Sequence, residues 1–180
     1  MLILLVALFW PRFGFSASNT AVDAGGLGLS ASGTVTVTSV RLGLVKQARD
    51  LSGTVLPGGS DVAVGTQIYF VLYLDNSTAV TATDIQLNDL LNETQFTYVV
   101  NSLESTVVAS ASSDAAIWAG SWSFLTDELG GPDDLASITD SDGPVGLDRI
   151  TIGAVSGQVN QGLNIIGSTL RAIRFRVTVN

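Results

Sequence analysis

The side chains of this sequence best suited to chemistry are carboxylates, which gather in one acidic segment, residues 127–148. Asp140 and Asp142 have the alternate spacing that places two carboxylates on one side of a loop, and calcium prefers such hard oxygen ligands. Asp133 and Asp134 precede them in the same segment. The segment lacks the third acidic position and the distal Glu of a helical calcium loop. These four aspartates are therefore candidate calcium ligands, and a solvated acidic loop is the alternative.

Composition excludes most catalytic chemistry, because the chain contains neither His nor Cys. It therefore has no Cys nucleophile, no His general base and no zinc site of the usual kind. A glycosidase needs two carboxylates across a sugar cleft. Asp133 and Asp134 are adjacent in a Gly/Pro-flanked stretch, and nothing in the sequence builds such a cleft around them. We expect no enzymatic activity and no cofactor other than calcium.

Two tripeptides, at Asn76 and at Asn92, match the acceptor pattern for N-glycosylation. In an exported protein both are candidate glycan sites, and a plain polar turn is the alternative. Three aromatic residues, Trp118, Trp122 and Phe124, are evenly spaced within residues 116–124. If this run is a strand, the three share one face, which either packs in the core or forms a platform for a sugar or a partner subunit.

The charge balance argues against a nucleic-acid partner. The 180 residues carry 8 Lys and Arg against 16 Asp and Glu, which gives a formal net charge of -8. Nucleic-acid binding requires clustered cations that neutralise phosphates. We therefore expect none.

The N-terminal residues resemble an export signal. Residues 1–10 are an apolar run about as long as a signal h-region and shorter than the roughly 20 residues of a membrane-spanning helix. Small residues follow, so cleavage is expected after Ala17 or Ser18, with retention of the segment as the alternative. We assign residues 1–17 as an apolar leader, expect no stable membrane span, and expect an extracellular or cell-surface location.

Residues 18–40 read as a flexible linker that ends in a candidate donor strand. Residues 18–33 are small and nearly uncharged, as in linkers. Val35 and Val37 then alternate with Thr, and Val40 resumes the alternation after a slip at position 39. Because β-branched residues with period two are typical of strands, these three valines are the candidates for strand donation.

Residues 41–180 carry short β-rich runs separated by Gly, Asn and Asp turns. Predicted strands include residues 66–75, 82–87, 96–100, 106–109, 116–124, 149–152 and 170–179, and single helical turns are expected only at 89–94 and 125–129. In the last run Ile173, Phe175 and Val177 alternate with Arg174 and Arg176, which predicts one core face and one wet, positive face. The pattern predicts an all-β fold, a single β-sandwich with an N-terminal strand-forming extension.

Residues 64–102 resemble the surface-protein repeat family catalogued as domain of unknown function eleven, and the similarity extends over residues 42–180. The matching positions are Gly65, Phe70, Asn76, Asp89 and the strand 96–100. Thr78 and Leu90 stand where the family usually has Gly and Pro. The resemblance implies an immunoglobulin-like sandwich, without enzymatic activity, on an exported or cell-surface protein.

Fibre-forming surface domains that the chain resembles sometimes carry a Lys–Asn isopeptide crosslink. Lys46 is the only lysine, it lies in the first predicted sandwich strand, and Asn180 ends the last one. Asp89 is the candidate buried acid that would assist the exchange. The alternative is a lysine that protects an exposed strand edge from aggregation.

These patterns favour an extracellular structural protein that polymerises with itself. We expect a filament or sheath subunit, joined by donation of an N-terminal strand to a neighbouring subunit. The alternative is a monomeric adhesive or ligand-binding module that uses the acidic loop or the Trp-bearing strand.

Overall fold

The computed structural model describes residues 16–22, 32–38, 42–128, 135–140, 146–154 and 160–180. The chain divides into two compact units, Met1–Arg41 and Leu42–Asn180.

The first unit contains a two-stranded antiparallel sheet. Strand β1 (Ser16–Val22) pairs with β2 (Ser32–Thr38), and Val35 and Val37 lie opposite Asn19 and Ala17. The sequence predicts a linker where β1 is found. The difference arises because the Val/Thr alternation of β2 offers a ladder of backbone hydrogen bonds to any chain opposite it. Val40 lies outside the described residues.

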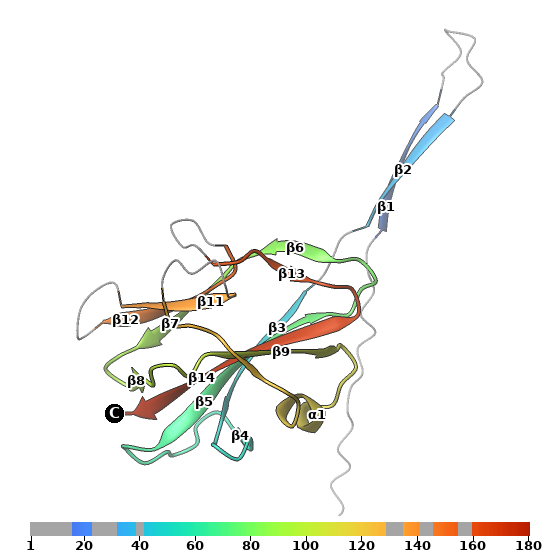
Figure 1. Cartoon of the computed structure of the whole chain (residues 1–180). Helices are drawn as coiled ribbons and strands as arrows, with labels where there is room; N and C mark the ends of the chain where they lie inside the picture. The colour runs from blue at the N-terminus through green and yellow to red at the C-terminus, as the bar shows by residue number, and fades with distance from the viewer. Residues whose placement is uncertain (1–15, 23–31, 39–41, 129–134, 141–145, 155–159) are drawn as a thin grey trace, which may run out of the picture. The chain divides into compact units, whose positions relative to one another are not determined.

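The second unit is an all-β sandwich, as the sequence predicts. Its main layer is a seven-stranded antiparallel sheet in the order β10-β9-β14-β5-β3-β4, with β8 also paired to β14 (Figure 1). These strands are β3 (Gly43–Arg49), β4 (Val55–Leu56), β5 (Gln67–Asn76), β8 (Phe96–Tyr98), β9 (Glu104–Ala109), β10 (Ser123–Phe124) and β14 (Thr169–Val179). The two longest of them, β5 and β14, pair over ten residues and form the centre of the sheet.

The second layer consists of two smaller antiparallel sheets. One has the order β11-β12-β7 and the other pairs β13 with β6. Their bounds are β6 (Ala82–Ile85), β7 (Leu87–Asn92), β11 (Ala136–Asp140), β12 (Leu147–Ile152) and β13 (Leu163–Ile165). Sequence reasoning expects a helical turn at 89–94 and no strand at 136–140, and both expectations are wrong. The segment that contains Asp89 pairs residue by residue with β12, so ladder hydrogen bonds outweigh local propensity.

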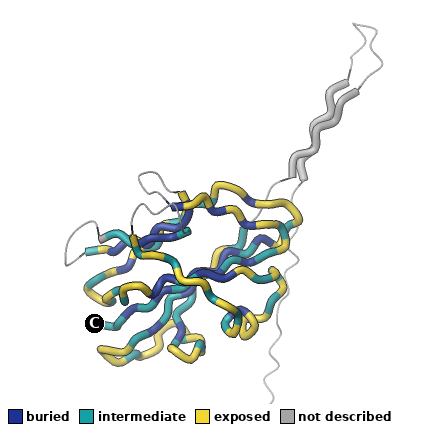
Figure 2. The backbone as a smooth tube through the Cα atoms, in the orientation of Figure 1, coloured by how far each residue is buried: buried dark blue, intermediate teal, exposed yellow. Residues whose placement is uncertain are grey.

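The hydrophobic core lies between the two layers. It includes Leu72, Leu74, Ile173, Phe175 and Val177 from the main sheet and Leu91, Ile150, Ile152, Leu163 and Ile165 from the second layer. Buried segments accordingly occur in both layers (Figure 2). The predicted core face of the last strand is confirmed, because Ile173, Phe175 and Val177 have no exposed surface.

A short helix, α1 (Asp114–Trp118), covers part of the opposite face of the main sheet (Figure 1). The Ser113 hydroxyl accepts a hydrogen bond from the Ala116 N–H and caps this helix. The prediction of one strand over residues 116–124 is therefore wrong, although its last two residues form β10. The prediction of a wet, positive face on β14 is also wrong at Arg174, whose side chain is only 12% exposed.

Candidate functional site: the open edge of β3

The most distinctive surface feature of the sandwich is a partly open edge on the main sheet. Strand β3 pairs with β5 along its whole length, from Gly43 opposite Asp75 to Arg49 opposite Tyr69. On its other side, β4 pairs only with Ala48 and Arg49. Within the described part of the chain, residues 43–47 therefore have no strand on their outer side. Such an edge presents free N–H and C=O groups to another chain.

The open stretch of β3 is apolar, which makes it unusual for an exposed edge. Leu44 is 53% exposed and Val45 is 49% exposed, and they point to opposite faces of the sheet because they are consecutive. Natural edge strands are commonly blunted by charges, prolines or bulges. Lys46 is the single charged residue of this stretch, and its ammonium group is engaged elsewhere.

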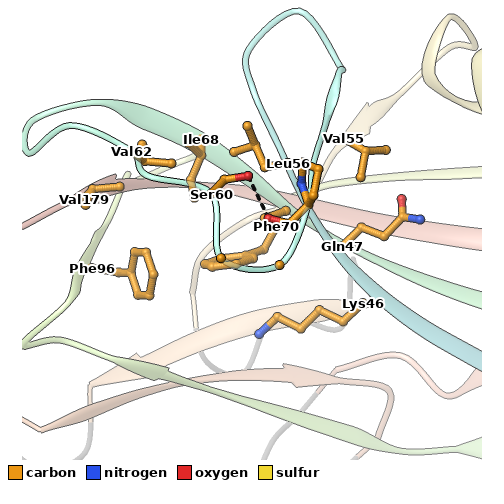
Figure 3. A pocket seen from close by; sticks show the side chains of 14 residues that line it. Lys46, Gln47, Val55, Leu56, Ser60, Val62, Ile68, Phe70, Phe96 and Val179 are labelled. Carbon is orange, nitrogen blue, oxygen red and sulfur yellow. Dashed lines mark hydrogen bonds between the residues drawn. The ribbon is translucent and has the colours of Figure 1, made fainter.

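A groove of about 610 Å³ continues from this edge on the inner face of β3 (Figure 3). Its walls are mainly apolar and are formed by Leu56, Val62, Ile68, Phe70, Phe96 and Val179. The loop of residues 57–60 forms one side and is held by a hydrogen bond of 2.7 Å from the Ser60 hydroxyl to the Pro57 carbonyl. The edge and the groove together form a surface that can receive an extended segment with apolar side chains.

Lys46 lies between the two layers of the sandwich at this groove. Its Nζ atom donates to Asp89 Oδ1 on β7 at 2.7 Å and lies 4.6 Å from the centre of the Phe70 ring. The lysine side chain is 38% exposed, whereas that of Asp89 is 12% exposed. Lys46 thus joins the layers electrostatically and does not extend outward along the edge.

The structure brings together two of the three residues predicted to form a crosslink. Lys46 is in register with Leu72 and, across it, with Ile173 of β14. Asn180 lies seven residues farther along the chain, so at about 3.3 Å per residue its backbone is roughly 20 Å along the strand direction from the position that is in register with Lys46. Its side chain instead contacts Thr97 and the Glu93 carbonyl. In this structure Lys46 and Asn180 thus bond to different partners, and the Lys46–Asn180 crosslink stays a prediction.

The predicted calcium ligands lie mostly outside the described residues. Asp133, Asp134 and Asp142 belong to segments of which nothing is described, and Asp140 ends β11 opposite Asp148 of β12. No group of three or more metal-ligating side chains occurs among the described residues. Calcium binding stays a prediction.

The two predicted glycosylation sites differ in accessibility. Asn76 has no exposed surface, and its Nδ2 atom donates to the carbonyls of Val80 at 2.8 Å and Ile165 at 2.9 Å. A glycan on that nitrogen would replace one of its two hydrogens and so remove at least one of these bonds, and the buried side chain offers no exposed surface for a sugar. Asn92 is exposed and its Oδ1 accepts from the Thr94 N–H and hydroxyl, so its amide nitrogen stays a candidate.

The aromatic residues of 118–124 do not share one face. The rings of Trp118 and Trp122 lie 6.3 Å apart, and the Arg174 guanidinium lies 4.7 Å and 4.0 Å from them. Arg174 also pairs with Glu104 at 2.5 Å. Phe124 lies apart from this cluster and is 77% exposed. The two tryptophans therefore cover an ion pair on the sheet, and a ligand platform on them stays a prediction.

The class of protein defined by these observations is an all-β sandwich preceded by a separate strand pair. No protein-family model, curated protein or solved structure matches the chain. The resemblance to the surface-protein repeat family therefore stays a prediction. Within the described residues, no helix is both long and apolar enough to span a bilayer.

Sequence reasoning named a candidate donor strand but did not find the open edge of β3. The residues 43–45, Gly-Leu-Val, read as an ordinary strand segment, because edge position depends on which strands lie beside it. The sequence feature that indicates the open edge is the turn at residues 57–60. It leaves only two residues for β4, too few to cover the whole of β3.

Proposed function

We propose that this chain is an extracellular structural subunit that associates with copies of itself by strand addition. The open edge of β3 at residues 43–47 is the acceptor, and the β1–β2 pair of a neighbouring copy is the donor. The observation that carries the proposal is the exposure of Leu44 and Val45 on an edge without an outer strand among the described residues. The apolar run at residues 1–10, typical of export signals, supports the extracellular location.

The donor is suited to this role because a two-stranded sheet is marginally stable alone. Strand β2 has the sequence Ser-Gly-Thr-Val-Thr-Val-Thr, which has high strand propensity. Each strand of a two-stranded sheet has one unpaired edge, so the pair can add to β3 as a unit. Addition to β3 would extend the two-stranded pair by a third strand and would cover the apolar side chains at the acceptor edge.

The expected strength of one such contact is modest. Four or five added backbone hydrogen bonds contribute about 0.5–1.5 kcal/mol each. Covering the exposed halves of Leu44 and Val45 adds about 1 kcal/mol each. Because association costs at least about 4 kcal/mol, gain and cost are of similar size. We therefore expect assembly that depends on protein concentration. Each copy both donates and accepts, so the contact is heterologous and extends into an open chain of subunits.

Substitutions on the full chain test the two sides separately. Val45→Lys places a charge on the acceptor edge, and Val37→Pro disrupts the donor strand. Val64→Lys is the matched control, because Val64 is 78% exposed and lies outside the strands. In sedimentation velocity over a concentration series, we expect the first two variants to stay monomeric and the control to assemble like the unmodified chain.

A mixing experiment distinguishes donation between copies from pairing within one copy. The Val37→Pro variant keeps an intact acceptor, and the Val45→Lys variant keeps an intact donor. An equal mixture should form heterodimers that contain one copy of each variant. Oligomers larger than a dimer should not form. Monomers in the mixture, or a monomeric unmodified chain at every concentration, would contradict the proposal.

A further inference from the structure

Arg171 lies on β14 in the centre of the main sheet, where it is paired with Val107 of β9 on one side and Leu74 of β5 on the other. It shares a face of β14 with Ile173, two residues along, which is fully buried in the core between the layers. The guanidinium therefore points toward the space between the layers and not toward the face covered by α1. It lines a pocket of about 390 Å³.

This guanidinium has no carboxylate partner among the described residues. Its hydrogen bond is donated by Nη1 to the Ser105 hydroxyl oxygen at 2.9 Å. By contrast, Lys46, Arg49 and Arg174 each lie within 2.7 Å of a carboxylate. Burial lowers the pKa of Arg171 from its ordinary value, which reflects the loss of hydration. An arginine nevertheless stays charged at neutral pH, so the described part of the fold carries a partly desolvated cation without compensation.

The surroundings of Arg171 combine hydrogen-bond donors with apolar walls. Ser105 is 5% exposed, and because its oxygen accepts from Arg171, its own hydrogen is available to a further acceptor. Phe124, Leu125 and Leu135 line the same pocket, and Phe124 is 77% exposed. An anion at the guanidinium would thus have an apolar surface beside it.

We propose that the pocket at Arg171 binds an organic monocarboxylate with a small apolar body. The carboxylate would pair with the guanidinium donors other than the one bonded to Ser105 and accept from the Ser105 hydroxyl, while the apolar body would contact Phe124, Leu125 and Leu135. This site is independent of strand addition at β3, because β5 separates β3 from β14 in the main sheet.

Charge and geometry favour a monocarboxylate over a phosphate ester. The planar guanidinium fork matches the two oxygens of a carboxylate. The chain has a net charge of -8, so its overall field repels a dianion more strongly than a monoanion. The pocket supplies one guanidinium and no second cation, because Arg171 is its only positively charged lining residue among those described.

Ligand-observed NMR titration of the full chain tests the site, with benzoate as the probe. At constant ionic strength we expect a dissociation constant on the order of 1 mM, as for a ligand of this size. Benzamide, which has the same shape and no charge, should bind at least tenfold more weakly. Phenyl phosphate at pH 8 should also bind more weakly than benzoate. Equal binding of benzamide, or stronger binding of phenyl phosphate, would overturn the assignment.

Three variants identify the residues responsible. Arg171→Gln should weaken benzoate at least tenfold, and Phe124→Ser, at an exposed position, should weaken it a few-fold. Arg176→Gln is the matched control and should leave binding unchanged, because Arg176 lies on the opposite face of β14 and contacts Gln67. Unchanged binding in Arg171→Gln would refute the proposal.

A stability measurement separates binding from a structural role. Because Arg171 is desolvated without a countercharge among the described residues, Arg171→Met should keep or raise the melting temperature while it abolishes benzoate binding. A melting temperature lowered by more than about 5 °C would show that the arginine supports the fold, and would overturn the assignment.

Discussion

At the scale of single residues, Gly53 fixes the position of Trp118. It has a positive φ of 92°, and a Cβ atom there would overlap the indole ring of Trp118. Its carbonyl also accepts from Arg49 Nη1 at 2.6 Å. The absence of a side chain thus allows the ring to lie directly on this turn.

We predict that Gly53→Ala lowers the free energy of unfolding by about 2–4 kcal/mol, the sum of left-handed backbone strain and overpacking. Gly59→Ala is the control, because Gly59 has a φ of 83° but no described atom lies within 4 Å of the place that a Cβ would take. Only the strain of about 1 kcal/mol is expected there. Urea denaturation measures both, and equal losses would show that the Trp118 contact is unimportant.

The Oδ1 atoms of Asn76 and Asn92 form the same kind of turn, but the two side chains differ in burial and in the hydrogen bonds of Nδ2. In both, Oδ1 accepts from the backbone N–H and hydroxyl of the Thr two residues later. Only Asn76 is buried and also joins β5 to the carbonyls of Val80 and Ile165. Asn76→Ala should therefore cost about 2–4 kcal/mol of stability, because two carbonyls lose their partner.

Asn92→Ala is the control for this prediction and should cost about 1 kcal/mol or less, because water replaces the exposed turn bonds. Thermal denaturation of the two variants provides the comparison. Similar losses at both positions would mean that the turn, and not the buried amide, is what stabilises the protein.

At the scale of elements, α1 is joined to the main sheet by Arg49. The Arg49 side chain is 3% exposed, and its Nη2 lies 2.5 Å from the Asp114 carboxylate in the first turn of α1. The hydroxyl of Tyr73 donates to the same carboxylate at 3.2 Å, and burial is the main cause that raises the pKa of Tyr73. A helix of five residues has little stability of its own, so these contacts hold it in place.

We predict that Arg49→Met destabilises the protein by about 2–3 kcal/mol, less than for a fully buried pair because Asp114 is half exposed. The helix should loosen first, which faster hydrogen exchange at residues 117–120 would report. Arg149→Met, at an exposed position on β12, is the control and should change stability by less than about 0.5 kcal/mol. Unchanged exchange in Arg49→Met would show that α1 is held by its apolar contacts alone.

At the scale of the whole molecule, the two units differ in the interactions that stabilise them. The described core residues all lie in Leu42–Asn180, whereas the first unit contributes a two-stranded sheet. We predict that deletion of residues 1–41 shifts the melting temperature of the dilute protein by less than about 2 °C, because it removes no described core contact. Differential scanning calorimetry measures this shift. A loss of cooperative unfolding would show that the sandwich depends on the first unit.

The amino-acid sequence by itself determined the class of fold and its central strands. Alternation along 170–179 and the β-rich run at 66–75 correspond to β14 and β5, because a strand buried on at least one face must show period two or a continuous apolar run. The separation between a Thr/Val-rich extension and the following domain is likewise local information. These features depend on residues close to one another in the chain.

The tertiary structure alone decided where these strands have neighbours and where side chains from distant segments meet. Residues 116–124 contain evenly spaced aromatics, yet Ser113 caps a helix that Arg49, 65 residues from Asp114, holds against the sheet. The open edge of β3, the Lys46–Asp89 pair and the position of Arg171 arise in the same way. Strand neighbours and countercharges are set by long-range pairing, whose choice depends on burying the whole core at once and is not encoded by local spacing.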